Sequence, residues 1–272
     1  MEIDSKENYI AEGLVHKIYK LNEYIYKIPK DEFEDFNNIE HFTIEKNCHQ
    51  ILRKNSLPAA EVLNIYDKGQ LIKNKCVLRE VFINGNVVDN RNITYRERKQ
   101  IISLMLKVNK IKTIGYGQIN SKGKTNFSNW CDYIKSCVKN FSSILEILEK
   151  KEIKDYLDFL IKEVKIIPEI NQGYFLTLDT NSNNYIFNDN EEIVAMLDID
   201  HPISGDVLYE YSALKFHHPE TFEILKNEYI NLNQEELNLL NYYFIHFGVS
   251  TIVFEYTHNL DLTNSLRSLR NV

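Results

Sequence analysis

The 34 residues from position 175 to position 208 show the clearest structural pattern in the sequence: FLTLDTNSNNYIFNDNEEIVAMLDIDHPISGDVL. This stretch contains two short apolar runs, residues 185–187 and residues 193–197, and a polar turn rich in Asn, Asp and Glu separates them. Apolar runs of this length on either side of such a turn are typical of paired strands. The stretch therefore predicts a hairpin with polar side chains around it.

Three of those polar side chains have the order and spacing of a phosphoryl-transfer site. Asp179 is followed five residues later by Asn184, and Asp198 ends the second apolar run. In such sites the first aspartate accepts the proton of the attacking hydroxyl, and the other two bind Mg²⁺, which prefers oxygen ligands. Two carboxylates alone would also fit glycoside hydrolysis, but that reaction leaves Asn184 without a role.

The beginning of the chain supplies two further charged residues that this chemistry needs. Alternating apolar and polar residues over positions 10–28 predict a β-hairpin with Lys27 on its second strand. A helical pattern over positions 37–53 carries Glu45. Kinases hold nucleotide phosphates with a strand lysine that a helix glutamate orients, and we expect Lys27 and Glu45 to have these roles.

The distribution of secondary structure predicts two lobes. Strands are expected at residues 62–66 and 75–82, and a hinge follows near Gly85. Beyond it, helical periodicity covers residues 96–111, 130–148, 153–164 and 234–256, with the longest loop at 111–127. We therefore expect an α+β fold: a small antiparallel β-sheet lobe with one helix, residues 1–84, and a larger, mainly helical lobe, residues 85–272.

Composition narrows the classes of partner. Lys and Arg total 32 against 39 Asp and Glu, a formal charge of −7, and no basic run forms a surface for nucleic acid. The acidic excess favours a cationic small substrate. The polar start MEIDSKENYI does not resemble a signal peptide, and no window approaches the roughly 20 apolar residues of a membrane span. We expect a cytoplasmic protein that binds neither nucleic acid nor membrane.

Several other motifs carry little weight. The first hairpin offers only Gly13 for a phosphate-covering loop. Gly115 and Gly117 follow a helix rather than a strand, so we interpret them as a turn. His217 and His218 have no third ligand at regular spacing, which favours a solvated helix end over a metal site.

Taken in order, the segments resemble the aminoglycoside phosphotransferase family of small-molecule kinases over nearly the whole chain. YIYKIPK resembles the lysine strand, TIEKNCHQILRKNSLPAAEVL the glutamate helix, and VLREVFING the hinge. DTNSNNYIFNDNEEIVAMLDIDHPISGDVLYEYSAL is similar to the D-x-x-x-x-N, [IL]-D-x-[DE] and G-D-x-x-Y segments, and S-N-N with G-D-x-x-Y-E resembles the hygromycin B phosphotransferase subgroup.

The resemblance implies a protein-kinase-like two-lobe fold and transfer of the γ-phosphate of ATP or GTP to a hydroxyl group of an aminoglycoside-type antibiotic. It implies that backbone groups of Glu80 and Phe82 hold the purine and that Asp206 is structural. We expect Asp200, Glu210 and Glu255 on the acceptor side of the site. The sequence does not distinguish ATP from GTP.

One position departs from the family pattern. The family usually has histidine two residues before the catalytic aspartate, and this chain has Thr177. The histidine mainly braces the loop, so the chemistry is retained without it. Two alternatives stay open: a metabolic kinase for choline, a sugar or a homoserine-like alcohol, and a catalytically silent nucleotide-binding protein.

Overall fold

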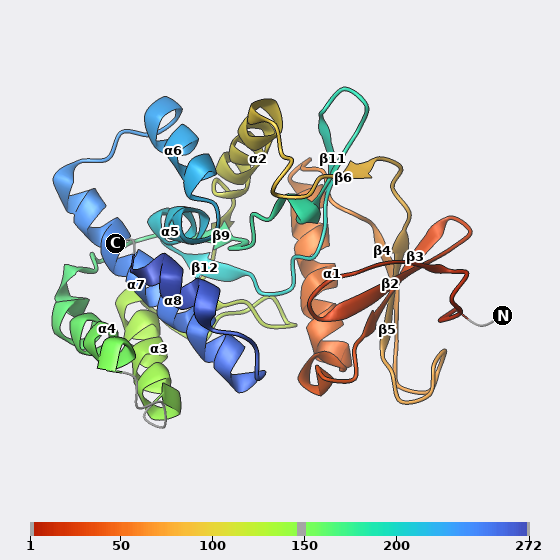
Figure 1. Cartoon of the computed structure of the whole chain (residues 1–272), viewed down its shortest axis with the longest axis horizontal. Coiled ribbons are helices and arrows are strands. Elements are labelled where there is room, and N and C mark those ends of the chain that lie inside the picture. Colours follow the sequence, from red (N-terminus) through yellow and green to blue (C-terminus); the bar gives the residue numbers. More distant parts are fainter. Residues whose placement is uncertain (1–2, 146–150, 271–272) are drawn as a thin grey trace. The chain divides into compact units, whose positions relative to one another are not determined.

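The computed structural model describes residues 3–145 and 151–270, which pack as two compact units (Figure 1). The first unit comprises Met1–Glu97, Asn120–Gly123 and Ser182–His201. The second comprises Arg98–Ile119, Lys124–Asn181 and Pro202–Val272. Each unit is built from segments that are distant in sequence, so neither unit corresponds to one continuous lobe. The lobe boundary after residue 84 therefore stays a prediction.

An antiparallel sheet of five strands forms most of the first unit. The strands are β1 (Tyr9–Glu12), β2 (His16–Leu21), β3 (Tyr24–Pro29), β4 (Val62–Tyr66) and β5 (Val77–Val81), in the order β1-β2-β3-β5-β4. Asn22, in the turn between β2 and β3, has a φ of 56°, a conformation that asparagine tolerates better than most residues. The predicted first hairpin is confirmed, while β1 was not predicted as a separate strand.

One helix, α1 (Ile39–Lys54), accompanies this sheet and follows the short 3₁₀ helix η1 (Glu34–Phe36). It begins where the Asn38 side chain accepts a hydrogen bond from the backbone N–H of His41, an N-cap that fixes the first turn. Phe42 of α1 is fully buried in a cluster with Val62 and Leu78 of the sheet. This packing fixes the helix register, and hence the direction of Glu45.

A second, smaller sheet completes the first unit. Its strands are β6 (Asn86–Val87), β10 (Tyr185–Phe187) and β11 (Ile193–Met196), in the order β11-β10-β6, and the short helix η3 (Ser182–Asn184) precedes β10. The pairing of β10 with β11 is antiparallel, with Tyr185 opposite Met196. The hairpin predicted between residues 185 and 197 is therefore confirmed.

The second unit is mainly helical. Its helices are α2 (Tyr95–Val108, from Arg98 onward), α3 (Trp130–Leu145), α4 (Lys151–Glu163), η2 (Val164–Ile166), α5 (Val207–His217), α6 (Pro219–Glu228), α7 (Gln234–Thr257) and α8 (Thr263–Leu269). A small sheet of β7 (Lys112–Thr113), β8 (Gly117–Gln118), β9 (Gly173–Leu176) and β12 (Ile203–Gly205) has the order β7-β9-β12-β8. Of the helix expected over 130–148, positions 146–148 lie outside the described residues.

Helix α7 is the central element of this unit and packs along α5 (Figure 1). It begins with a capping box, in which Asn233 and Glu236 exchange side-chain and backbone hydrogen bonds. Among the described residues it is the one helix long and apolar enough to cross a membrane. Most of its apolar surface is buried inside the unit, however, and a core helix of this kind meets the same criterion.

Candidate active site

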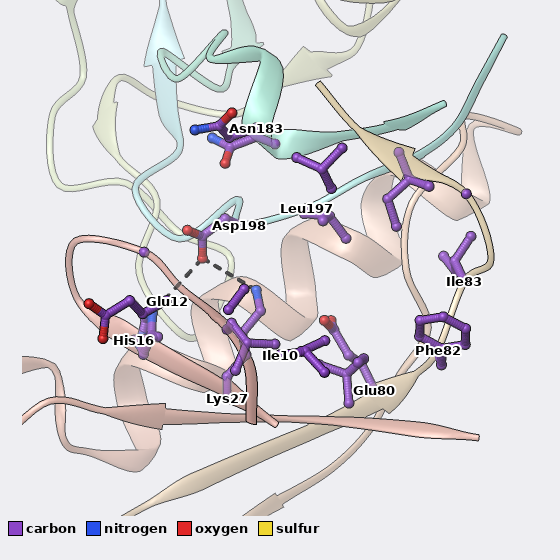
Figure 2. Close-up of a pocket in the computed structure, with 18 of the residues that line it drawn as sticks. Ile10, Glu12, His16, Lys27, Glu80, Phe82, Ile83, Asn183, Leu197 and Asp198 are labelled. Carbon is purple, nitrogen blue, oxygen red and sulfur yellow. Dashed lines mark hydrogen bonds and ion pairs between the residues drawn. The ribbon is translucent and has the colours of Figure 1, made fainter. Parts of the chain in front are cut away.

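A cavity of about 470 Å³ lies within the first unit, between the five-stranded sheet and the β10–β11 hairpin (Figure 2). This volume is in the range of small-ligand pockets. Most of the residues predicted to bind nucleotide or Mg²⁺ line it: Gly13, Lys27, Glu80, Phe82, Asn184 and Asp198. The structure therefore brings together side chains from widely separated parts of the sequence.

Lys27 makes the central ion pairs of this cavity. It lies in the middle of β3, between Ile18 of β2 and Leu78 of β5, and only 4% of its surface is exposed. Its Nζ forms an ion pair with Oε1 of Glu45 on α1 and a second with Oδ1 of Asp198 at 3.3 Å. Burial alone would lower the pKa of Lys27, but the neighbouring carboxylates outweigh it and raise this pKa well above its ordinary value.

The β10–β11 hairpin explains how Asn184 and Asp198 reach the same edge. The backbone N–H of Leu197 donates to the carbonyl oxygen of Asn184 at 2.8 Å, so the residues flanking the two strands lie opposite each other. Asp198 has a φ of 58°, a left-handed conformation that is uncommon for residues other than glycine and recurs at functional sites.

The charge state of Asp198 suits a cation ligand. Burial would raise its pKa, but Lys27 and His16 lower it to about 2, so the carboxylate is charged at neutral pH. Its side chain is 39% exposed, which leaves room for a further partner besides Lys27. A charged carboxylate beside an asparagine amide is an all-oxygen donor set, and this set fits Mg²⁺.

His16 is a pocket residue that the sequence did not single out. It lies on β2, its Nδ1 is 4.0 Å from Oδ1 of Asp198 (Figure 2), and its ring stacks on that of His41 at 5.5 Å between centroids. Burial lowers its pKa to about 4, so the imidazole is neutral at pH 7. The strand alternation places His16 on the same face as Ile18, a signal that could have located it.

Glu80 and Phe82 differ from the expectation. The N–H of Phe82 already donates to the carbonyl oxygen of Glu23 at 2.9 Å, so only the Phe82 carbonyl can take part in the predicted purine contact. The Glu80 residue sits in the central strand β5 and pairs with both neighbouring strands. It is its side chain that faces the cavity, and burial raises the pKa of that carboxyl to about 7.

Gly13 forms the turn between β1 and β2. Its N–H donates to the carbonyl oxygen of His16 at 2.9 Å, which closes a tight connection at the edge of the cavity. No atom lies within 4 Å of the position that a Cβ would take. The turn therefore leaves space for a ligand to approach its backbone, although it lacks the several glycines of a phosphate-binding loop.

Asp179, the predicted base, lies in the second unit and is exposed. Its Oδ1 accepts hydrogen bonds from the backbone N–H of Asn181 at 3.1 Å and from the Asn181 amide at 2.6 Å. The Asn181 side-chain oxygen in turn lies 3.0 Å from Nε2 of His218. His218 is thus joined to the loop of the base and is not the solvated helix end that we expected.

Glu210 corrects another expectation. It is fully buried in α5, and its Oε1 accepts hydrogen bonds from the backbone N–H groups of Thr177 and Leu178 at 2.9 and 3.0 Å. The Thr177 hydroxyl donates to the same oxygen at 2.6 Å, and Asn109 donates to Oε2. Burial raises the pKa of Glu210, and these donors oppose that effect. Glu210 therefore braces the segment before Asp179 and has no surface to offer an acceptor.

The remaining acidic candidates have separate environments. Asp206 caps α5 by accepting a hydrogen bond from the N–H of Leu208 at 3.0 Å, which agrees with the structural role implied for it. Oε1 of Glu255 on α7 accepts from the Ser265 hydroxyl of α8 at 2.7 Å. Asp200 lies in the first unit, beside His41. An acceptor-side role for Asp200 and Glu255 stays a prediction.

A small antiparallel sheet with one helix, followed by a mainly helical unit, is the architecture of the protein-kinase-like fold class. No protein-family model and no curated protein matches the sequence. Solved structures of aminoglycoside phosphotransferases are among those that match, and the chain has their fold.

The similarity extends over nearly the full length of these structures. Apo aminoglycoside phosphotransferase APH(4)-Ia, as a thermostable mutant, has 16% identity and a TM-score of 0.76, covering 96% of this chain and 90% of that one. A complex of that enzyme with AMP-PNP and hygromycin B has 17% identity and a TM-score of 0.75, covering 97% and 91%. The GDP and kanamycin complex of APH(2")-IIIa has 12% identity and a TM-score of 0.68, covering 100% and 93%.

Proposed function

We propose that this protein is a small-molecule kinase that transfers the γ-phosphate of ATP or GTP to a hydroxyl group of an aminoglycoside. The observation that carries the proposal is the pair of contacts made by Lys27, with Glu45 and with Asp198, inside a cavity of nucleotide size. A buried lysine held by two carboxylates presents a fixed positive charge, and such a charge suits the phosphates of a nucleotide.

The reaction assigns one step to each group. Asp179 accepts the proton of the acceptor hydroxyl as its oxygen attacks the γ-phosphorus. The bond from that phosphorus to the β–γ bridging oxygen breaks, and the nucleoside diphosphate leaves with the electron pair. Lys27 neutralises charge on the phosphates, and Glu45 keeps the lysine in place.

Asn184 and Asp198 are the residues that would hold Mg²⁺, because they offer oxygen donors at one edge of the cavity. When bound, Mg²⁺ neutralises charge on the nucleotide phosphates. The low pKa of Asp198, about 2, keeps this ligand ionised over the whole physiological range.

Two observations support an aminoglycoside as acceptor. Structures with the same fold were solved with hygromycin B and with kanamycin bound. The chain also carries a formal charge of −7, which favours a polycationic partner. ATP and GTP are cytoplasmic metabolites, and we therefore propose a cytoplasmic enzyme.

The test is release of nucleoside diphosphate in the presence of Mg²⁺ and ATP or GTP. The acceptor panel contains aminoglycosides, including hygromycin B and kanamycin, together with choline, methylthioribose and homoserine. We expect release that depends on an aminoglycoside and falls by about 10²–10⁴-fold in Asp179→Asn. Asp189→Asn, an exposed change in the β10–β11 turn, is the matched control.

The outcomes separate the candidate functions. Release that depends only on choline, methylthioribose or homoserine would replace the aminoglycoside with a metabolic acceptor. Nucleotide binding without turnover on any acceptor would favour the catalytically silent protein. Full activity of Asp179→Asn would refute the assignment of the base.

A further inference from the structure

A cluster of two histidines and one aspartate lies in the first unit, outside the proposed Mg²⁺ pair. His41 is in the first turn of α1, whereas Asp200 and His201 follow β11. Nε2 of His41 is 3.6 Å from Oδ2 of Asp200, and Nε2 of His201 is 4.0 Å from the same oxygen. One ligand atom from each residue lies within 4.8 Å of the other two.

His41 supplies the observation that points to a ligand. Its side chain is 7% exposed, and its Nε2 has no hydrogen-bond partner among the described residues. A buried polar atom without a hydrogen-bond partner is destabilising and therefore rare in folded proteins. A metal ion bound between His41, Asp200 and His201 would give this nitrogen a partner.

The surroundings hold the cluster in place. The side chain of Asn38 caps α1 at the backbone N–H of His41, which fixes the start of the helix. The ring of Phe36 stands edge-on to His41 and to His201, at centroid distances of 5.1 and 5.6 Å. His41 also stacks on His16, at 5.5 Å between ring centroids. Phe36 thus shields one part of the cluster from water, as apolar residues commonly do around metal sites.

We propose that His41, Asp200 and His201 bind a divalent transition-metal ion of the Zn²⁺ and Co²⁺ type. Imidazole with one carboxylate is a donor set that these ions prefer, whereas Mg²⁺ prefers oxygen alone. Zinc–ligand bonds of about 2.0–2.2 Å require ligand atoms a little over 3 Å apart in a tetrahedron. The spacings of 3.6 and 4.0 Å would have to shorten by up to about 0.7 Å, which a change of side-chain rotamer at exposed His201 can supply.

The site has three protein ligands, and exposed His201 leaves a fourth position open to water or another small ligand. Its donor atoms, two imidazole nitrogens and a carboxylate oxygen, differ from the oxygen donors of Asn184 and Asp198. The proposal also gives Asp200 a role other than the acceptor-side one predicted from sequence. It does not depend on the kinase activity, since binding is measured on the protein alone.

The experiment uses the full chain without an affinity tag, after treatment with a chelator. Co²⁺ is titrated while its visible absorption is recorded, because imidazole ligation in a site of low coordination number gives an intense band. Zn²⁺ is then added in competition. We expect one Co²⁺ per chain, displaced by Zn²⁺ and retained in excess Mg²⁺.

Variants locate the ion. His201→Ala changes an exposed residue and is expected to fold normally, yet to weaken binding about tenfold or more; His41→Gln should do the same. Asp198→Asn should keep the Co²⁺ band, which separates the site from the Mg²⁺ pair. The matched control is His217→Ala with His218→Ala, the other neighbouring histidines. The proposal is overturned if wild type gives no band, or if the band survives His41→Gln and His201→Ala.

Discussion

The backbone N–H of Thr177 donates a hydrogen bond to Oε1 of Glu210 at 2.9 Å, and the Thr177 hydroxyl donates to the same oxygen at 2.6 Å. Leu178, the next residue, has a φ of 62°, and its N–H also donates to this oxygen. A buried carboxylate with several donors can hold a strained backbone conformation. In this chain the pair fixes the entry to the Asp179 loop, where the family usually has a histidine.

Glu210→Ala should therefore lower both stability and turnover. It leaves the N–H groups of Thr177 and Leu178 buried without an acceptor, and we expect a loss of about 2–4 kcal/mol in the free energy of unfolding. Glu210→Gln keeps one acceptor oxygen and should lose less. Unfolding in urea measures the change in stability. The change in turnover is measured as kcat at a temperature below the unfolding transition of the variant. An alanine variant as active and stable as wild type would exclude the brace.

The hydroxyl of Thr177 can be tested separately. Thr177→Val removes one donor to Glu210 with little change in shape, and we expect a cost of about 1–2 kcal/mol. Thr177→Ser keeps the hydroxyl and serves as the control. Because the two residues are in contact, the effects of Thr177→Val and Glu210→Ala should not add in the double variant. Additive unfolding free energies would show that the contact contributes nothing.

Lys27→Met should abolish tight nucleotide binding. The change removes the ammonium group that pairs with both Glu45 and Asp198, and it leaves a fully buried Glu45 carboxylate without its lysine. Breaking a buried pair in this way costs about 3–5 kcal/mol. Binding of a fluorescent ATP analogue and thermal unfolding are the measurements. Lys17→Met, an exposed change on β2, should leave both at the wild-type level.

The raised pKa of Glu80 predicts that the stability of the protein depends on pH. Its pKa is about 7 in the folded protein against an ordinary value of 4.5. The folded state thus keeps a proton that the unfolded state has already released, so stability falls as pH rises from about 4.5 to about 7. The loss is about 3–4 kcal/mol, because each pKa unit corresponds to about 1.4 kcal/mol. Glu80→Gln should flatten this part of a plot of unfolding free energy against pH; an unchanged slope would exclude Glu80 as its source.

The close packing around Gly85 predicts that a larger residue there would clash with β10. It has a φ of 155°, and a Cβ there would lie 2.6 Å from the carbonyl oxygen of Phe187, with Ile186 nearer still. Gly85→Ala should therefore displace β6 from β10 and lower the melting temperature. Gly123→Ala is the control, because Gly123 has a φ of 70° but open space around its Cβ position. If both variants lose the same stability, backbone strain and not the contact with β10 is responsible.

The sequence predicted those elements whose periodicity is plain. The hairpin of β10 and β11 has two apolar runs with a polar turn between them, and it is confirmed; Asn184 and Asp198, which flank it, both line the cavity. Helix α5 was missed because eight of its eleven residues are buried, so it shows no polar face. Its burial also explains the error at Glu210, since a glutamate among aromatic residues looks exposed until the helix is known to be enclosed.

Other parts of the site depend on contacts that no local pattern encodes. His16 meets Asp198 only because β2 and the end of β11 are brought to one cavity. Likewise, the N–H of Phe82 is occupied by Glu23 from the turn between β2 and β3, which a reading of the hinge alone does not reveal. Long-range pairing of strands, and not local propensity, decides both cases.

The first unit includes Ser182–His201, so it cannot complete its folding during synthesis when only the chain up to Glu97 has emerged from the ribosome. Met196 must still arrive to pair with Ala59, and Ile186 to pair with Val87. At about 5–20 residues per second, the amino-terminal strands wait on the order of ten seconds with those partners missing. A nascent chain of this protein therefore exposes unpaired apolar surface for much of its synthesis. We expect its folding yield to rise with chaperone binding and to fall when translation slows before residue 201.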